Sequence, residues 1–180
     1  MSRIFGEIRQ VAYITDDMDR TLAFLSETAG IGPWFVARDV TLKDVTYRGT
    51  TCDLRIGAAL ANSGALQVEV IQQHNDVPSM YTEFTDRNGF GLIPQHYSAW
   101  PTAYDATLRR ALDAGFEVIQ EGRSAYGPLS YLQHPETPDF YMELTELTAE
   151  RKSIFDQVRD AADGWDGSDP VREGWPTPKV

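Results

Sequence analysis

Four polar side chains in this sequence are of the types that hold a divalent metal ion. They offer one amide oxygen, two carboxylates and one imidazole, and they are Gln10, Glu69, His96 and Glu143. Each glutamate interrupts an apolar segment, 66–71 or 140–144, where a carboxylate is costly to desolvate unless a partner compensates its charge. Such a set suits one Zn²⁺, Ni²⁺, Co²⁺, Mn²⁺ or Fe²⁺ ion, with coordination positions left open for water or substrate.

An internal repeat connects these four residues, each of which, taken singly, is more often structural or solvent-facing. The matching positions are Asp19 with Asp105, Thr21 with Thr107, Leu22 with Leu108, and Ala29-Gly30 with Ala114-Gly115. In this alignment Gln10 and His96 open the first strand of each half, whereas Glu69 and Glu143 lie in the last strand of each half. Two halves related by a pseudo-two-fold axis would bring all four side chains to a common centre.

Each half of the repeat has the pattern of a strand, a capped helix that stops at glycine, and three further strands. The further strands are expected at 33–39, 45–56 and 64–73, and then at 116–121, 128–133 and 139–146. The predicted fold is α+β, with two βαβββ modules forming a curved mixed sheet around a metal cavity. The expected divisions are a first module at 5–75, a linker with a short helix at 76–92, a second module at 93–147, and a C-terminal helix with an irregular tail at 148–180.

The composition restricts the classes of partner. The chain has 180 residues and a formal net charge of −11, so we expect no nucleic-acid partner, because phosphates would be repelled. No segment approaches the roughly 18 apolar residues of a membrane span, and the N-terminus lacks the apolar region of a secretory signal. Cys52 is the single cysteine, which excludes an intrachain disulfide and favours a reducing, cytoplasmic location. A small-molecule substrate and a homodimer are the expected partners.

At this point the sequence resembles the vicinal oxygen chelate superfamily, which includes glyoxalase I, methylmalonyl-CoA epimerase, ring-cleaving dioxygenases and antibiotic-sequestering proteins. The resemblance covers residues 5–147 and is nearest to the epimerase branch. It is carried by the segments 10–13, 67–70 with Asn75-Asp76, Gly91-Leu92 before His96, and 142–144. It implies metal ligation by Gln10, Glu69, His96 and Glu143. Epimerases of this branch usually carry His at the position of Gln10 and Gln at that of Glu69, and the present combination is similar to one glyoxalase I pattern.

The resemblance implies a metal-dependent isomerase, an epimerase or racemase that removes the proton α to a carbonyl through a metal-stabilised enolate. The candidate bases are Glu143 and Asp53, which falls where the epimerase branch carries a catalytic acid. The candidate substrate-binding residues are Trp34, Arg55, Tyr97, Trp100 and Tyr131. If they line the cavity, a bulky or aromatic ketone or acyl substrate is favoured. Asp53 and Arg55 could equally be a solvated ion pair, and the aromatic residues ordinary core.

Two other classes of function stay open at this level. One is a glyoxalase-type lyase or a metal-dependent dioxygenase of the same fold, although ring-cleaving dioxygenases normally use two His and one Glu around iron. The other is a non-catalytic protein that binds and sequesters a small molecule.

Overall fold

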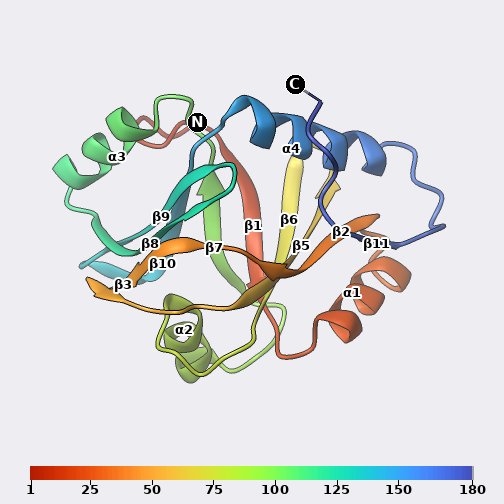
Figure 1. Cartoon of the computed structure of the whole chain (residues 1–180), viewed down its shortest axis with the longest axis horizontal. Helices are drawn as coiled ribbons and strands as arrows, with labels where there is room; N and C mark the ends of the chain where they lie inside the picture. Colours follow the sequence, from red (N-terminus) through yellow and green to blue (C-terminus); the bar gives the residue numbers. More distant parts are fainter. Residues whose placement is uncertain (180) are drawn as a thin grey trace.

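One curved mixed sheet, surrounded by four helices, makes up the protein in this computed structural model, which describes residues 1–179 (Figure 1). The strands are β1 (Ile8–Ile14), β2 (Trp34–Val40), β3 (Lys43–Tyr47), β4 (Thr50–Thr51), β5 (Ile56–Ser63), β6 (Leu66–Gln73), β7 (Pro94–Ala99), β8 (Glu117–Ser124), β9 (Gly127–His134), β10 (Thr137–Thr145) and β11 (Val171–Glu173). The helices are α1 (Met18–Glu27), α2 (Met80–Asn88), α3 (Tyr104–Asp113) and α4 (Ala149–Ala162). The order across the sheet is β11-β2-β5-β6-β1-β7-β10-β9-β8-β3-β4.

The repeat is visible in the strand pairing and confirms the predicted α+β fold of two βαβββ modules. The first module contains β1, α1, β2, β5 and β6, and the second contains β7, α3, β8, β9 and β10. The two modules join where β1 and β7 pair in antiparallel fashion, with Gln10 opposite Ser98 and Ala12 opposite His96. This register places Gln10 and His96 at equivalent positions about a pseudo-two-fold axis.

The parallel pairs that flank this junction extend the symmetry to the two glutamates. Ala12 pairs with Glu69 across β1 and β6, and Ser98 pairs with Glu143 across β7 and β10. Because Ala12 and Ser98 are themselves equivalent, Glu69 and Glu143 are equivalent as well. The sheet therefore positions the four polar residues on its four central strands.

The segment 45–56, expected to be one strand, is divided in the structure. A turn with Arg48 at φ 47° and Gly49 at φ 77° separates β3 from β4, and residues 52–55 are irregular. The third long strand of the first module is instead β5, a buried run rich in alanine that lies between β2 and β6. The sequence favours a strand at 45–56 because β-prone residues occupy most of it, whereas alanine has a weak strand preference and is accepted in β5 by burial on both faces.

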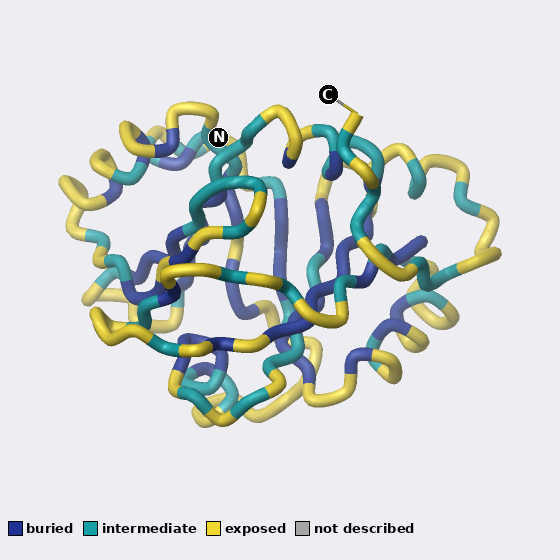
Figure 2. Tube along the Cα trace, in the orientation of Figure 1, coloured by how far each residue is buried: buried dark blue, intermediate teal, exposed yellow. Residues whose placement is uncertain are grey.

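Side chains of β5 show how the two faces of the sheet are covered. Ala59 and Ala61 point to the face packed against α1, in a cluster with Leu22 and Trp34. Leu60 points to the opposite, inner face, where it packs against Ile154 and Val158 of α4. The central strands are consequently buried on both sides, while loops and outer helix faces are exposed (Figure 2). None of the helices in residues 1–179 is long and apolar enough to cross a lipid bilayer.

Helix ends follow the expected local signals in most cases. Asp17 caps α1 by accepting from the backbone N–H of Arg20, and Ser79 caps α2 in a capping box with Thr82. Thr148 caps α4 by accepting from the backbone N–H of Arg151. The tail after α4 was expected to be irregular, and it differs by adding β11 to the edge of the sheet, parallel to β2.

Candidate active site

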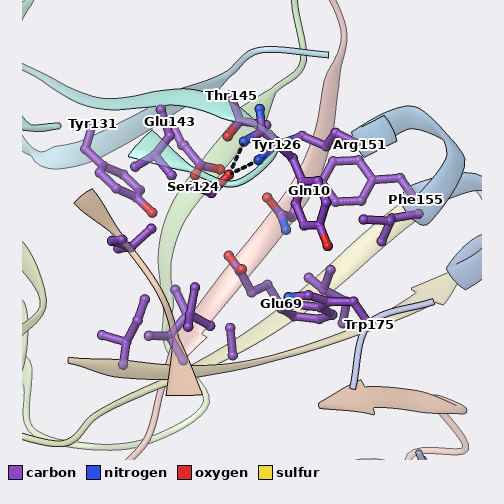
Figure 3. A pocket seen from close by; sticks show the side chains of 18 residues that line it. Gln10, Glu69, Ser124, Tyr126, Tyr131, Glu143, Thr145, Arg151, Phe155 and Trp175 are labelled. Carbon is purple, nitrogen blue, oxygen red and sulfur yellow. Dashed lines mark hydrogen bonds between the residues drawn. The ribbon is translucent and has the colours of Figure 1, made fainter. Parts of the chain in front are cut away.

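A cavity of about 110 Å³ lies between the inner face of the sheet and α4 (Figure 3). Its polar lining comes from Gln10, Glu69, Ser124, Glu143, Thr145 and Arg151. The remaining lining is mainly aliphatic and aromatic, with side chains from β5, β9 and α4 and with Trp175 from the tail. An apolar cavity with a few convergent polar groups is the usual form of a small-molecule site.

His96 lies beside Glu69 and Glu143, is fully buried and does not itself line the cavity. Its Nδ1 is 2.7 Å from the side-chain oxygen of Gln95, and an amide oxygen can only accept, so Nδ1 carries the proton. The other ring nitrogen, Nε2, is a buried acceptor without a hydrogen-bond partner. It faces two carboxylates, at 3.5 Å from Glu69 Oε2 and 3.8 Å from Glu143 Oε2.

Burial shifts the protonation equilibria of all three groups toward their neutral forms. Desolvation raises the pKa of Glu69 to about 8 and lowers the pKa of His96 to about 4. Desolvation also raises the pKa of Glu143, which is opposed by its attraction to His96 and reinforced by repulsion from Glu69. Perturbed groups of this kind, gathered in a cavity, are typical of a functional site.

A positive charge between His96 Nε2 and the carboxylates of Glu69 and Glu143 would stabilise all three groups. A neutral imidazole lone pair and two carboxylates repel one another unless a proton or a cation lies between them. Gln10 donates its amide N–H to Gln67 at 3.0 Å, an orientation that keeps its Oε1 as an acceptor. This donor set fits a divalent cation. Among residues 1–179 no group of three or more His, Cys, Asp or Glu side chains stands out as a metal site, so ligation by these four residues stays a prediction.

The shifted pKa values predict how the stability of the metal-free protein depends on pH. Between pH 4.5 and 8 Glu69 is protonated in the fold but ionised when unfolded, so its contribution falls as the pH rises. Between pH 4 and 6.5 the contribution of His96 to stability rises as the pH rises, because only the unfolded chain binds its proton. The two effects offset each other between pH 4.5 and 6.5. From there to about pH 8 Glu69 makes stability fall by about 1.4 kcal/mol per pH unit, and the raised pKa of Glu143 acts in the same direction.

Urea unfolding after treatment with a chelator measures this dependence. The Glu69→Gln variant should lose most of the decline between pH 6.5 and 8, because the replacement has no proton to release. A decline of equal slope in the variant would contradict the assignment to Glu69.

Tyr131 is the one predicted substrate-binding residue that lines the cavity. Its ring lies edge-on to His96, with centroids 5.2 Å apart. Tyr81 donates its hydroxyl proton to the Tyr131 oxygen at 3.0 Å, which leaves the Tyr131 proton available for another acceptor. Burial raises the pKa of Tyr131 well above its usual value, so this hydroxyl stays protonated.

The other predicted binding residues lie outside the cavity, and so does the second candidate base. Asp53 and Arg55 are exposed in the irregular segment before β5, because the strand that was to present them ends at Thr51. Trp34 is fully buried between the sheet and α1. Tyr97, which follows His96 on β7, points to the other face and stacks on Phe140. Trp100 packs against Phe155 and Arg9 outside the cavity lining.

Sequence reasoning missed the contribution of the C-terminal region to the site. Arg151 of α4 is 4% exposed and lines the cavity. Its guanidinium donates to Ser124 Oγ at 2.9 Å and to the carbonyl oxygens of Gly127 and Glu146. Burial lowers its pKa, opposed by the attraction of Glu143. The signal was present, because Arg151 shares the helical stripe of Ile154 and Val158.

The fold and this polar group together define a protein of the vicinal oxygen chelate type. A family model described as the Glyoxalase/Bleomycin resistance protein/Dioxygenase superfamily matches residues 9–130. The chain belongs to this superfamily, which confirms the resemblance seen in the sequence. None of the curated proteins matches the sequence at a significant level.

Solved structures support the same fold at low sequence identity. Methylmalonyl-CoA epimerase from Mycobacterium tuberculosis is 17% identical, with a TM-score of 0.56, over 82% of this chain and 92% of that one. A Streptomyces coelicolor methylmalonyl-CoA epimerase in complex with 2-nitronate-propionyl-CoA is also 17% identical, with a TM-score of 0.53, over 81% and 99% of the two chains. At these identities the likeness concerns the fold.

Proposed function

We propose that this protein is a metal-dependent isomerase, an epimerase or racemase acting at the carbon α to a carbonyl. The observation that carries the proposal is the unpartnered Nε2 of buried His96, which faces Glu69 and Glu143 within 4 Å. Both glutamates line the mainly apolar cavity. The epimerase structures of similar fold are consistent with this reaction.

In this proposal Gln10, Glu69, His96 and Glu143 hold one divalent ion of Zn, Ni, Co, Mn or Fe. A cation bound there would polarise the substrate carbonyl and lower the cost of the enolate. Glu143 acts as the base that removes the α-proton, because burial raises its pKa toward the working range of a base. Protonation of the same carbon on its opposite face, with a proton that has exchanged with solvent, gives epimerisation.

Tyr131 has a separate role as a hydrogen-bond donor. Its hydroxyl is buried and protonated, and its proton is not used in the contact with Tyr81. Donation to a substrate oxygen would hold the substrate in one orientation and stabilise negative charge that develops on that oxygen.

The lining of the cavity favours a neutral, bulky or aromatic ketone over a polyanionic substrate. Arg151 is the one cationic residue among those that line the cavity, and its N–H groups are engaged with Ser124 and backbone carbonyls. Two carboxylates face the same space, and the net charge of the chain is −11. We therefore propose an uncharged α-hydroxy ketone rather than a CoA thioester, whose phosphates would require cationic partners.

Deuterium exchange in D₂O tests this function. Enantiopure α-hydroxypropiophenone should incorporate deuterium at the α-carbon and lose optical purity when the protein has been loaded with Zn²⁺, Ni²⁺, Co²⁺ or Mn²⁺. No exchange above the buffer rate with any of these metals would refute the isomerase. Turnover of a hemithioacetal in its place would establish the lyase alternative.

A second candidate is a non-catalytic protein that sequesters a small molecule. The mainly apolar lining of the cavity favours it, because such a surface binds aromatic ligands without metal. Elemental analysis of protein grown with added metals separates the two, since the binding protein would contain less than about a tenth of an equivalent. A homodimer and a cytoplasmic location stay predictions, and light scattering measures the first.

A further inference from the structure

The tail that follows α4 forms one side of the cavity. Trp175 lines the cavity together with Phe155 and Ile154 of α4. Figure 3 shows the indole of Trp175 next to Glu69 in the lining. Trp175 is partly buried and packs against two apolar clusters, one beneath the cavity and one under α4. All of these C-terminal residues lie beyond residues 9–130, which the family model matches.

The contacts that hold the tail lie on either side of Trp175. Before it, β11 pairs over three residues with β2, Glu173 forms an ion pair with Arg38 at 3.0 Å, and Gly174 donates its N–H to the Val36 carbonyl at 2.7 Å. After it, Gln157 of α4 donates to the Thr177 carbonyl at 2.9 Å, and the Lys179 N–H donates to Ser153 Oγ at 2.8 Å. Few backbone hydrogen bonds and partial exposure are the properties of a segment that opens locally at low free-energy cost.

The cavity is smaller than a ligand of ordinary size requires. Its volume is about 110 Å³, whereas pockets that enclose a ligand of ordinary size measure about 300–1,000 Å³. The lining from the sheet and from α4 is held by regular secondary structure, and Ile154 and Val158 pack closely on Leu60. The tail is the wall that can supply the missing space, because Trp175 is only partly buried and residues 174–179 belong to no helix or strand.

We propose that Trp175 is the residue that determines which ligands the cavity accepts, acting as a movable wall carried by the tail. Displacement of the tail opens the cavity, and the indole then packs on the apolar part of the bound ligand. Ligands with one aromatic ring are accommodated, and ligands with two fused rings are excluded by the indole. The inference rests on the proposed use of this cavity for aromatic ketones, although the measurements below require neither metal nor turnover.

Ligand binding to the metal-free protein tests the wall directly. The probes are α-hydroxypropiophenone and its naphthyl analogue, with dissociation constants measured by calorimetry. Relative to the unsubstituted protein, Trp175→Ala should shift the ratio of the two dissociation constants by about tenfold or more in favour of the naphthyl ligand. Trp175→Phe should give a ratio between those of Trp175→Ala and the unsubstituted protein. An unchanged ratio of the two constants in Trp175→Ala would overturn the proposal.

Trp165 provides a matched control in the same tail. Its indole packs so closely against Gly32 that any larger side chain at that position would clash with it, and it does not line the cavity. Trp165→Ala should therefore leave the ratio of the two dissociation constants unchanged. An equal change in both variants would show a general loosening of the tail and would also count against a specific role of Trp175.

Hydrogen exchange measures the movement itself in the unsubstituted protein. The amide of Gly174 is expected to exchange at least about 100-fold faster than amides of β5, and slower once a ligand is bound. Protection of Gly174 equal to that of β5 would contradict a movable wall. Because this readout uses no substrate turnover, it stays informative even if the isomerase activity is not found.

Discussion

Replacement of His96 by Ala is expected to lower the affinity for divalent metal by about 100-fold or more. His96 supplies the only imidazole at the centre of the sheet, and its Nε2 has no other hydrogen-bond partner. Without it the remaining candidates are oxygen donors, which bind Zn²⁺, Ni²⁺ and Co²⁺ less well. Calorimetric titration of the metal-free protein with each ion measures the change in affinity. His96→Gln is expected to show the same loss with a side chain of similar size.

The chain contains a matched control for this variant. His74 is exposed and outside the cavity lining, and its ring Nε2–H donates to the Arg38 carbonyl oxygen 2.9 Å away. His74→Ala should retain the metal affinity of the unsubstituted protein. If His96→Ala bound metal equally well, or if the loss appeared in His74→Ala instead, the proposed centre would be wrong.

Replacement of Glu143 by Gln is expected to reduce α-proton exchange by about 1,000-fold, the range measured for loss of a general base. The amide preserves the size of the side chain and removes its ability to take a proton. Glu143 is 6% exposed, and its Oε2 lies 3.8 Å from His96 Nε2 at the centre. Proton NMR of α-hydroxypropiophenone in D₂O measures the exchange rate with metal at saturation.

Separate metal titration shows which role Glu143 performs. Loss of exchange with the metal affinity retained would identify it as the base, whereas parallel loss of both would identify it as a ligand. Glu121→Gln is the control, because this residue is exposed on β8 and outside the cavity lining. Full exchange activity in Glu143→Gln would refute both roles.

The central part of the site could be predicted because the repeat fixes it. Short-range signals give the first and last strand of each half, and duplication then places Glu69 and Glu143 at equivalent positions without any knowledge of distances. The two-residue alternation of β7 could also have shown that Tyr97 points away from the cavity if His96 points toward it. The substrate-binding role of Tyr97 stays a prediction that this orientation does not support.

Other features depended on contacts that no local pattern records. Asp53 was placed in a strand because the residues around it alternate, but β3 pairs with β8 of the other module and the chain turns at Gly49. Arg151 and Trp175 come to the cavity from the C-terminal region, which has no counterpart in the repeat. Their positions depend on long-range packing of α4 and β11, which sequence periodicity does not specify.

The pairing of β3 with β8 of the other module affects how each half of the chain can fold. A duplicated ancestor could have begun as two self-sufficient halves, but here the first half provides the strand that covers the outer edge of β8. The second half alone would expose that edge to other chains and is expected to aggregate. Without β3 the second half is therefore not expected to fold as a stable unit.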